Sequence, residues 1–438
     1  MNHLARKISF GLLLAPALAQ AAPAPLLWKG ALAEALKSNP SLASARLAVQ
    51  AAESGETAAS SAFWPSLSAN AGLSRSGAMA LDSPSGLSSS GEADSSSYQL
   101  GLQGSWNLFN GFATVYGRLA AGEALAQKKA LYSQASASLL SSLRQAFNQL
   151  YFDQKNAALL ENIASRYHKD TRYQDLQFQS GQTARWTFLK AQSDEAEVAW
   201  QVEQNQLSLQ ADQASLASLL GRPLGEASSL SVEGSLDVPA PPESDAADWA
   251  KISKDSPTVL IAQASLASSQ DALGSARASL YPDLNASGSY GYSGAQQWGP
   301  DTRSWSASLN LGFNLFGGGA SVAAINEASA NLDAARQDLS NTLSELEASL
   351  HKAWASYTSS YHRLPIAAQA TAAGEERFKT VEVLYQSGRA AFLDYEQAES
   401  IYTQAQQQEL SVDLSAAQAR AAHLNILGVS LEDAQAAP

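Results

Sequence analysis

The sequence predicts a mainly α-helical protein with four membrane β-strands, built from two copies of one structural unit. Three observations predict this fold class: an internal duplication, four short segments with period-two alternation, and long stretches with seven-residue apolar spacing. Each copy is expected to contain a short helix, a β-hairpin, a long helix, a tight turn and a second short helix. The first copy is expected over residues 22–221 and the second over residues 248–428.

The duplication is visible in landmarks that recur at two fixed separations. Pro40 and Pro257 are 217 residues apart, and so are Pro65 and Pro282. Later landmarks are only 207 residues apart, so one loop in the second copy is ten residues shorter. Exposed loops tolerate such length changes, whereas packed helices would lose their register. The landmarks separated by 207 residues are WNLFNG (106–111) with FNLFGG (313–318), QSG (179–181) with QSG (386–388), and LG (220–221) with LG (427–428).

Composition excludes several classes of function. The chain has 438 residues, of which 16% are charged, and its formal net charge is −13. An acidic protein has no basic face with which to neutralise phosphates, so no nucleic-acid partner is expected. The chain has no cysteine, so it has neither disulfides nor the cysteine that anchors a lipoprotein.

Residues 1–21 are predicted to be a signal peptide. Arg6 and Lys7 precede a short apolar stretch, and Ala19-Gln20-Ala21 offers a cleavage site. Export from the cytoplasm is therefore expected. No later segment approaches 18 consecutive apolar residues, so any membrane contact is expected from strands or an amphipathic surface.

Four segments alternate apolar and small polar residues and are predicted to be strands. They cover about 66–76, 98–109, 283–293 and 305–316, and their hairpin loops are 77–97 and 294–304. Aromatic residues near the strand ends favour membrane strands that are apolar toward lipid and polar toward a lumen. The alternative is a pair of amphipathic hairpins packed on a soluble core. Four strands cannot close a barrel, so several chains must share one; two chains would supply eight strands and three would supply twelve.

Two long helices are predicted from heptad spacing. The first is expected over 112–178, where a span of about 67 residues would reach roughly 100 Å. In its apolar seam, which runs from Leu139 to Tyr167, only Asp153 is polar. In the second copy, Pro365 is expected to kink or interrupt the long helix. Residues 222–247 are predicted to be a surface linker between the copies, and 429–438 a C-terminal tail.

This order of elements resembles the TolC-like outer membrane efflux protein family. The resemblance covers essentially the whole mature chain, and its motifs are SNPSL and DSPTV, FWPSL and LYPDL, WNLFNG and FNLFGG, and QSGQT and QSGRA. It implies a homotrimer with a twelve-stranded β-barrel in outer membrane lipid and a long α-helical barrel in the periplasm. It also implies a passive exit duct joined by a periplasmic adaptor (membrane fusion) protein to an inner-membrane pump or ABC exporter, for efflux or type I secretion.

The resemblance implies a gate at the periplasmic end. It places a ring of aspartates at Asp394, where three carboxylates would favour cations; alternatively, Asp394 favours the start of the returning helix. The family's second aspartate position is Gln397 here, so the chain departs from the pattern. Tyr385 matches a tyrosine that ties the closed state, or it is a packed coiled-coil aromatic. The corresponding position in the first copy is Thr187, where the family has an acid.

The two tight turns are expected to form the tip that meets the adaptor. They comprise Ser180, Gly181, Gln182 and Thr183 in the first copy, and Ser387, Gly388, Arg389 and Ala390 in the second. Glycine also permits the tight reversal by itself. Trp186 and Phe188 beside the first turn are interpreted as core residues rather than adaptor contacts. Asn110, Gly111, Gly317 and Gly318 are expected to form the strand-to-helix hinges.

The sequence gives no sign of catalysis, so neither an enzyme nor a cofactor is expected. None of the five histidines has a metal or base partner at a suitable spacing. The competing hypotheses are a periplasmic coiled-coil structural or adaptor protein without a membrane barrel, an enzyme on a helical scaffold, and an autonomous porin. The nature of the cargo (drug, metal or protein) does not follow from the sequence.

Overall fold

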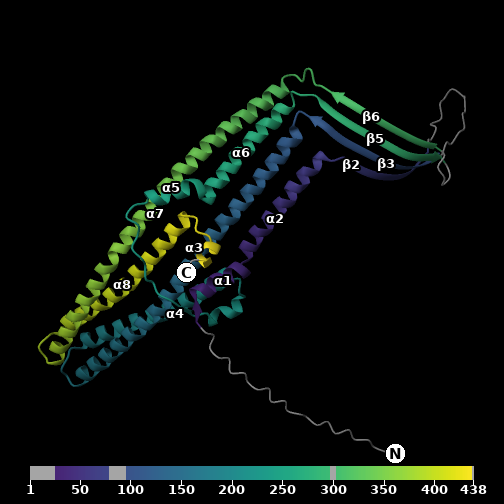
Figure 1. Ribbon diagram of the computed structural model, residues 1–438. Coiled ribbons are helices and arrows are strands. Elements are labelled where there is room, and N and C mark those ends of the chain that lie inside the picture. Colours follow the sequence, from purple (N-terminus) through teal and green to yellow (C-terminus); the bar gives the residue numbers. More distant parts are fainter. Residues whose placement is uncertain (1–24, 78–94, 296–301, 437–438) are drawn as a thin grey trace, which may run out of the picture. The chain divides into compact units, whose positions relative to one another are not determined.

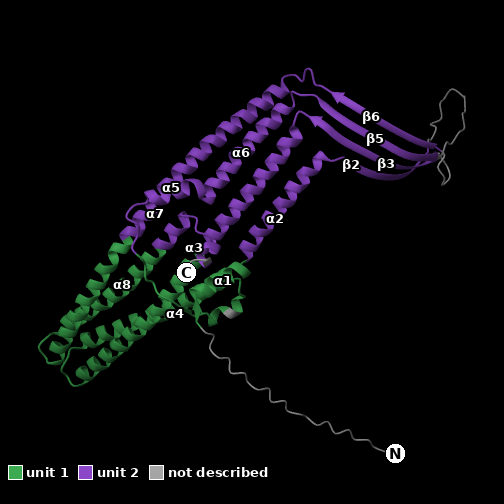
Figure 2. Ribbon diagram, viewed as in Figure 1, with its two compact units in different colours: residues 1–39, 142–239, 360–418 green, residues 40–141, 240–359, 419–438 purple. Residues whose placement is uncertain are grey.

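The computed structural model describes residues 25–77, 95–295 and 302–436 (Figure 1). The predicted signal peptide and most of both hairpin loops lie outside these residues. The described chain forms two compact units (Figure 2). Unit 1 comprises residues 1–39, 142–239 and 360–418, and unit 2 comprises 40–141, 240–359 and 419–438.

Both copies contain the same series of helices and strands. The first copy contains α1 (Trp28–Ser38), α2 (Pro40–Ser60), the 3-10 helix η1 (Ser61–Phe63), β2 (Ser66–Ser76), β3 (Ser95–Asn110), α3 (Ala113–Gln179) and α4 (Arg185–Leu220). The second contains α5 (Ala246–Asp255), α6 (Pro257–Ala278), β5 (Asp283–Ala295), β6 (Thr302–Gly312), α7 (Ala320–Gln386) and α8 (Phe392–Ile426). The strand predicted over 305–316 therefore lies at 302–312, because residues beyond Gly312 leave the ladder before the glycine-rich hinge.

The helical stretch that precedes each hairpin is broken once. Asn39 separates α1 from α2 and is extended, with ψ of 120°. Ser256 separates α5 from α6 with ψ of 133°. Both residues precede a proline, which disfavours helical geometry for the preceding residue and is itself well suited to the first helical position. The two prolines that mark the duplication thus begin the second helix of each pair.

The four long strands form one antiparallel sheet in unit 2, in the order β2-β3-β5-β6. The register places Leu73 opposite Tyr98 and Tyr290 opposite Trp305, so the apolar side chains share a face. On the other face small polar residues meet; Ser66 and Ser105 hydroxyls are 2.7 Å apart, as are those of Ser287 and Ser308. The apolar face is open in the single chain, since Leu67 and Trp305 are each 77% exposed.

Each long helix has 67 residues. Helix α7 continues through Pro365, so of the two predicted outcomes, a kink or an interruption, the interruption is absent. Proline costs a helix one hydrogen bond and a local clash, roughly 3 kcal/mol, and the many bonds on both sides keep this helix continuous. None of the described helices is long and apolar enough to cross a membrane.

Each unit has its own apolar packing. In unit 1, Leu160 and Ile163 of α3 pack against Val198 of α4, and all three are buried. In unit 2, Ile252 and Val259 pack against Leu346 and Leu350 of α7. Leu160, Leu346 and Leu350 belong to the predicted heptad seams, so these seams contribute to the helix-packing surfaces.

The linker and the tail are more ordered than the sequence suggests. In the linker region, Leu230 and Val232 are buried, and strand β4 (Val232–Glu233) pairs in parallel with β1 (Leu26–Leu27). Residues Leu431–Ala436 of the tail form helix α9, whose Glu432 accepts hydrogen bonds from Tyr132 at 2.7 Å and Ser136 at 2.6 Å. Ser430 and Asp433 cap this helix reciprocally, since each backbone N–H is bonded to the other residue's side-chain oxygen.

Candidate functional site

The two inter-helix turns of unit 1 have the same backbone geometry. Gly181 follows α3 with φ of +74°, and Gly388 follows α7 with φ of +72°. In each turn the residue after the glycine donates its N–H to a helix carbonyl at 2.8 Å: Gln182 to Gln177, and Arg389 to Leu384. No atom lies within 4 Å of a Cβ added at either glycine, so the left-handed backbone rather than crowding requires glycine here.

Side chains around both turns are exposed, including several large apolar ones. Ser180, Gln182, Ser387 and Arg389 are exposed, whereas Thr183 and Ala390 are half-buried. The structure does not place Trp186 in a core as expected: it is 57% exposed. Phe188 stacks on Phe178 with ring centroids 5.9 Å apart. Other exposed apolar side chains near the turns are Leu176, Leu189, Val383, Leu384 and Leu393.

Tyr385, predicted as a closed-state tie, lies where a helix of the second sequence copy meets a helix of the first copy. Its hydroxyl oxygen accepts a hydrogen bond from the Gln174 amide of α3 at 2.6 Å, and Gln174 is buried. Its ring stacks on Tyr395 of α8 at 4.9 Å. Burial raises the pKa of the Tyr385 phenol, so the hydroxyl stays neutral. Tyr385 is therefore a packed aromatic and also a hydrogen-bonded link between α3 and α7. Its role in holding a closed state stays a prediction.

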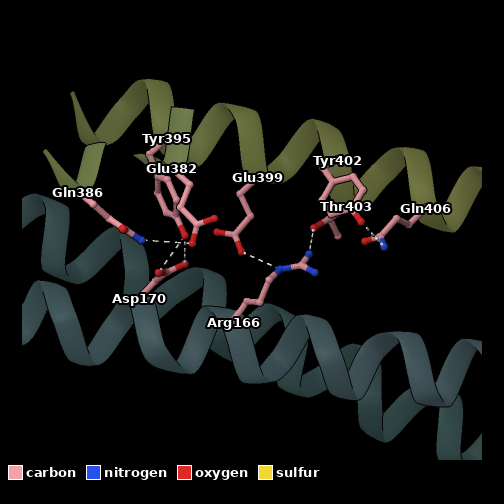
Figure 3. Close-up of polar contacts among 9 residues, drawn as sticks. All are labelled: Arg166, Asp170, Glu382, Gln386, Tyr395, Glu399, Tyr402, Thr403 and Gln406. Atoms are coloured by element: carbon pink, nitrogen blue, oxygen red, sulfur yellow. Dashed lines mark hydrogen bonds and ion pairs between the residues drawn. The ribbon is translucent and has the colours of Figure 1, made fainter. Parts of the chain in front are cut away.

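A second link joins α3 to α8 through Asp170. The Tyr395 hydroxyl lies 3.0 and 2.9 Å from the two Asp170 carboxylate oxygens and donates to them (Figure 3). Tyr395 itself is buried. Burial raises the pKa of Asp170, although the hydrogen bonds from Glu399 and Tyr395 act in the opposite direction.

A third link follows one turn along the same two helices. Arg166 of α3 donates from Nε to Glu399 Oε1 at 3.3 Å and from Nη2 to Thr403 Oγ1 at 2.9 Å. Its guanidinium group also lies 5.5 Å from the Tyr402 ring centroid. In Figure 3, Arg166 and Asp170 point from one helix toward Tyr395, Glu399 and Thr403 on the other. We call Arg166, Asp170, Gln174, Tyr385, Tyr395, Glu399 and Thr403 the inter-repeat tie.

The tie contains two carboxyl groups, those of Asp170 and Glu399, but only one positively charged side chain, Arg166. The Glu399 side chain is only 3% exposed. Burial and the nearby Asp170 together raise its pKa to about 8, although Arg166 acts in the opposite direction. One arginine therefore serves two carboxylates, and near neutral pH the pair retains a proton. Outside the tie, Lys190 of α4 adds a more exposed bridge to Glu396 of α8 at 3.0 Å.

The remaining predicted gate residues lie at the starts of the returning helices. Asp394 is exposed in the first turn of α8, and its carboxylate accepts the Ala391 N–H at 3.4 Å, as a helix-start residue does. Thr187 is buried near the start of α4, where its hydroxyl bonds to the Ala184 carbonyl at 2.5 Å and lies 2.6 Å from the Thr183 hydroxyl. Thr187 thus stabilises its own turn, and Tyr385 is bonded to Gln174 instead.

The predicted hinges lie between strand and helix in unit 2. Asn110 Oδ1 accepts the Thr114 N–H at 3.2 Å and so caps α3. Gly111 has φ of +63°, and an added Cβ would come within 2.8 Å of Tyr281 Cβ. In the second copy the positive φ values fall at Gly318 and Gly319, which correspond to Gly111 and Phe112. Gly317 does not share this conformation.

Most residues of the tie were not among the predicted site residues. Arg166 and Asp170 are four residues apart, as are Tyr395 and Glu399, so each pair shares one helix face. That spacing is visible in the sequence, but the pairing of the two faces spans more than two hundred residues. Among the described residues, no group of three or more His, Cys, Asp or Glu side chains could hold a metal ion.

Comparison with known proteins identifies relatives over most of the chain. The profile of the family described as Outer membrane efflux protein matches residues 31–222 and 251–429, one match for each copy. No curated protein sequence matches this chain.

Several solved structures share the fold. A membrane protein from Pseudomonas aeruginosa has a TM-score of 0.78 and 21% identity, with 91% of this chain and 92% of that chain covered. The CmeC outer membrane channel of Campylobacter jejuni has a TM-score of 0.77 and 18% identity, with 91% and 84% covered. The MtrE outer membrane channel of Neisseria gonorrhoeae, solved in its open state, has a TM-score of 0.75 and 21% identity, with 91% and 88% covered.

Proposed function

The chain belongs to the outer membrane efflux protein family, and from this premise we propose that it is a passive duct whose closed state is held by the inter-repeat tie. Members of this family are trimeric channels of three-part efflux systems rather than enzymes. The predictions of the family, of the mainly helical fold and of an outer membrane efflux channel are confirmed. The alternative of a periplasmic coiled-coil protein is thereby set aside. Type I secretion stays a prediction.

The gating proposal rests on one observation, the position of the inter-repeat tie. The tie joins α3, from the first-copy helix pair α3 and α4, to the second-copy pair α7 and α8, within a few turns of both inter-helix reversals. Separating these two helix pairs breaks the Gln174–Tyr385, Asp170–Tyr395 and Arg166–Glu399 contacts together. Each buried hydrogen bond contributes about 1 kcal/mol, and more where a charged group takes part. A partner that separates the pairs must supply several kcal/mol.

The exposed turns are the proposed docking point for that partner. Ser180, Gly181, Gln182 and Thr183, with Ser387, Gly388, Arg389 and Ala390, form two reversals of like geometry beside exposed Trp186 and Val383. An adaptor protein of the periplasm would cover these apolar side chains, and an inner-membrane pump would supply the energy. The predicted signal peptide, residues 1–21, would direct export of the chain, and its proposed location is the outer membrane of a Gram-negative-type cell, extending into the periplasm.

Site-specific cross-linking tests the docking step. A photoreactive residue is introduced at Gln182 or Arg389 in cells that carry the whole system, with Glu203, an exposed residue of α4, as the control position. We expect both turn positions to cross-link to the same periplasmic adaptor and the control position to give no such product. Equal cross-linking from Glu203, or none from either turn, would contradict docking at the turns.

A further inference from the structure

A polar pocket between α3 and α4 in unit 1 lies away from the tie. It has a volume of about 680 Å³ and lies among residues of α3 and α4 and one residue of α8. Its polar lining consists of two aspartates, six amide side chains and one serine. Within this lining set no lysine, arginine or histidine occurs. The polar lining residues are Gln149, Asp153, Asn156, Gln201, Gln204, Asn205, Ser208, Asp212 and Gln407.

Two buried oxygen atoms in this pocket lack a donor. Asp153 is 3% exposed and Asn205 is 6% exposed. The Asn205 amide donates to Asp153 Oδ1 at 3.4 Å, which leaves Asp153 Oδ2 and Asn205 Oδ1 without a hydrogen-bond partner. A buried acceptor with no partner costs about 1–3 kcal/mol, and more when it is charged. The pocket therefore presents unsatisfied oxygen ligands to whatever occupies it.

Asp212 adds a second carboxylate to the same place. The Asp212 carboxyl is adjacent to the Asp153 carboxyl and lines the same pocket. Two ionised carboxylates have no hydrogen to share, so only a proton or a cation can join them. Carboxylate and amide oxygens with completing waters are the ligands that Ca²⁺ and Mg²⁺ prefer.

We propose that Asp153, Asn205 and Asp212 form a binding site for a hard divalent cation such as Ca²⁺, which bridges α3 to α4. The charge of the ion matches that of the two carboxylates. The pocket's amide side chains and water complete the oxygen shell. The site belongs to the first copy alone, because the equivalent positions in the second copy are Ser360, Val412 and Ala419.

The second copy also supplies the variant for the test. Asp153→Ser/Asn205→Val/Asp212→Ala places in the first copy the residues that the same fold carries in the second, so folding is expected to persist. Trp200 lines the pocket and can sensitise bound Tb³⁺, a luminescent probe for Ca²⁺ sites. Asp333→Asn, at an exposed ion pair with Arg336 on α7, is the control variant.

The experiment titrates the full-length protein in detergent with Tb³⁺ and displaces the probe with Ca²⁺. We expect saturable emission from the wild type and Asp333→Asn, and at least tenfold weaker binding by the triple variant. The Trp200→Phe variant should lose the sensitised emission yet keep a Ca²⁺-dependent rise in Tm. If the wild type binds no Tb³⁺, or the triple variant binds it equally well, the proposal is overturned and a shared proton joins the two carboxylates.

Discussion

The Tyr395 hydroxyl of α8 lies 2.9 Å from Asp170 Oδ2 and 3.0 Å from Asp170 Oδ1 of α3. This contact joins the second copy of the duplicated sequence to the first. The same Tyr395 ring stacks on Tyr385, whose hydroxyl oxygen accepts a hydrogen bond from Gln174. Two tyrosines that stack on each other thus hold α3 through separate hydrogen bonds. This arrangement connects the sequence duplication to the gate, because the contacts run between the copies.

The buried Glu399 should make stability depend on pH. Its folded-state pKa is raised to about 8 from 4.5, so the folded state keeps a proton that the unfolded chain loses near pH 4.5. The stabilisation is complete below pH 4.5 and is lost as the pH rises toward 8, at about 1.4 kcal/mol per pH unit at most. The Tm of the wild type should therefore fall between pH 5 and 8. We expect Glu399→Gln to remove the part of that fall that is due to the Glu399 carboxyl.

Glu203→Gln is the control for that measurement, because Glu203 is exposed on α4. Its Tm should follow the wild-type curve across the same pH range. If the Glu399→Gln curve also parallels the wild type, the Glu399 carboxyl does not carry the extra proton.

Asp394 distinguishes an acidic ring from a helix start. If three Asp394 carboxylates surround the axis of the trimer, Asp394→Asn should weaken block of the channel by a trivalent cation by about tenfold or more. Asp175→Asn, at a carboxylate of α3 bonded to Gln179, is the control and should leave the block unchanged. If the block by the trivalent cation is unchanged in Asp394→Asn while the Tm is lower, Asp394 only stabilises the start of α8 and does not form a ring.

The backbone at the second hinge gives a stability prediction. Gly319 has φ of +87°, a conformation that costs a residue with a side chain about 1–2 kcal/mol. Gly319→Ala should therefore lower the Tm of the protein, whereas Gly317→Ala should change it little. An added Cβ at Gly317 meets only the flexible Asn314 amide, at 3.1 Å. A similar loss in both variants would show that the loss of flexibility, rather than strain at positive φ, sets the cost.

The corresponding position in the first copy is Phe112, with φ of +72°. It is the only residue other than glycine with positive φ among those the structure describes. Its ring makes an edge contact with Phe109 at 5.3 Å, which offsets part of the strain. The two copies thus share a backbone conformation that different residues occupy.

Sequence reasoning predicted the parts of this protein that depend on local pattern. Alternation predicted the strands, heptads predicted the long helices, and glycine predicted the turns at Gly181 and Gly388, because each depends on residues near one another in the chain. The breaks before Pro40 and Pro257 were not predicted. The sequence contains the signal for them, since proline restricts the residue before it.

The tie was less predictable because its contacts join distant segments. Tyr385 was identified, but its partners Gln174 and Tyr395 come from separate helices, and helix rotation decides which faces meet. Asp153 was noted only as a break in an apolar seam. Its partners Asn205 and Asp212 lie on α4, about 50 residues away, so they are identified only when α4 packs against α3.

Single-channel conductance of Tyr395→Phe in planar bilayers tests the gate most directly. The change removes one hydroxyl and keeps the stacked ring, so the half-buried Asp170 loses one of its two donors, at a cost of about 1–3 kcal/mol to the closed state. We expect at least a fivefold increase in the open fraction over the wild type. Tyr402→Phe should match the wild type, since the Tyr402 hydroxyl bonds only to Gln406 of its own helix. Equal conductance of Tyr395→Phe and the wild type, both inserted as trimers, would contradict the inter-repeat tie as the closed-state lock.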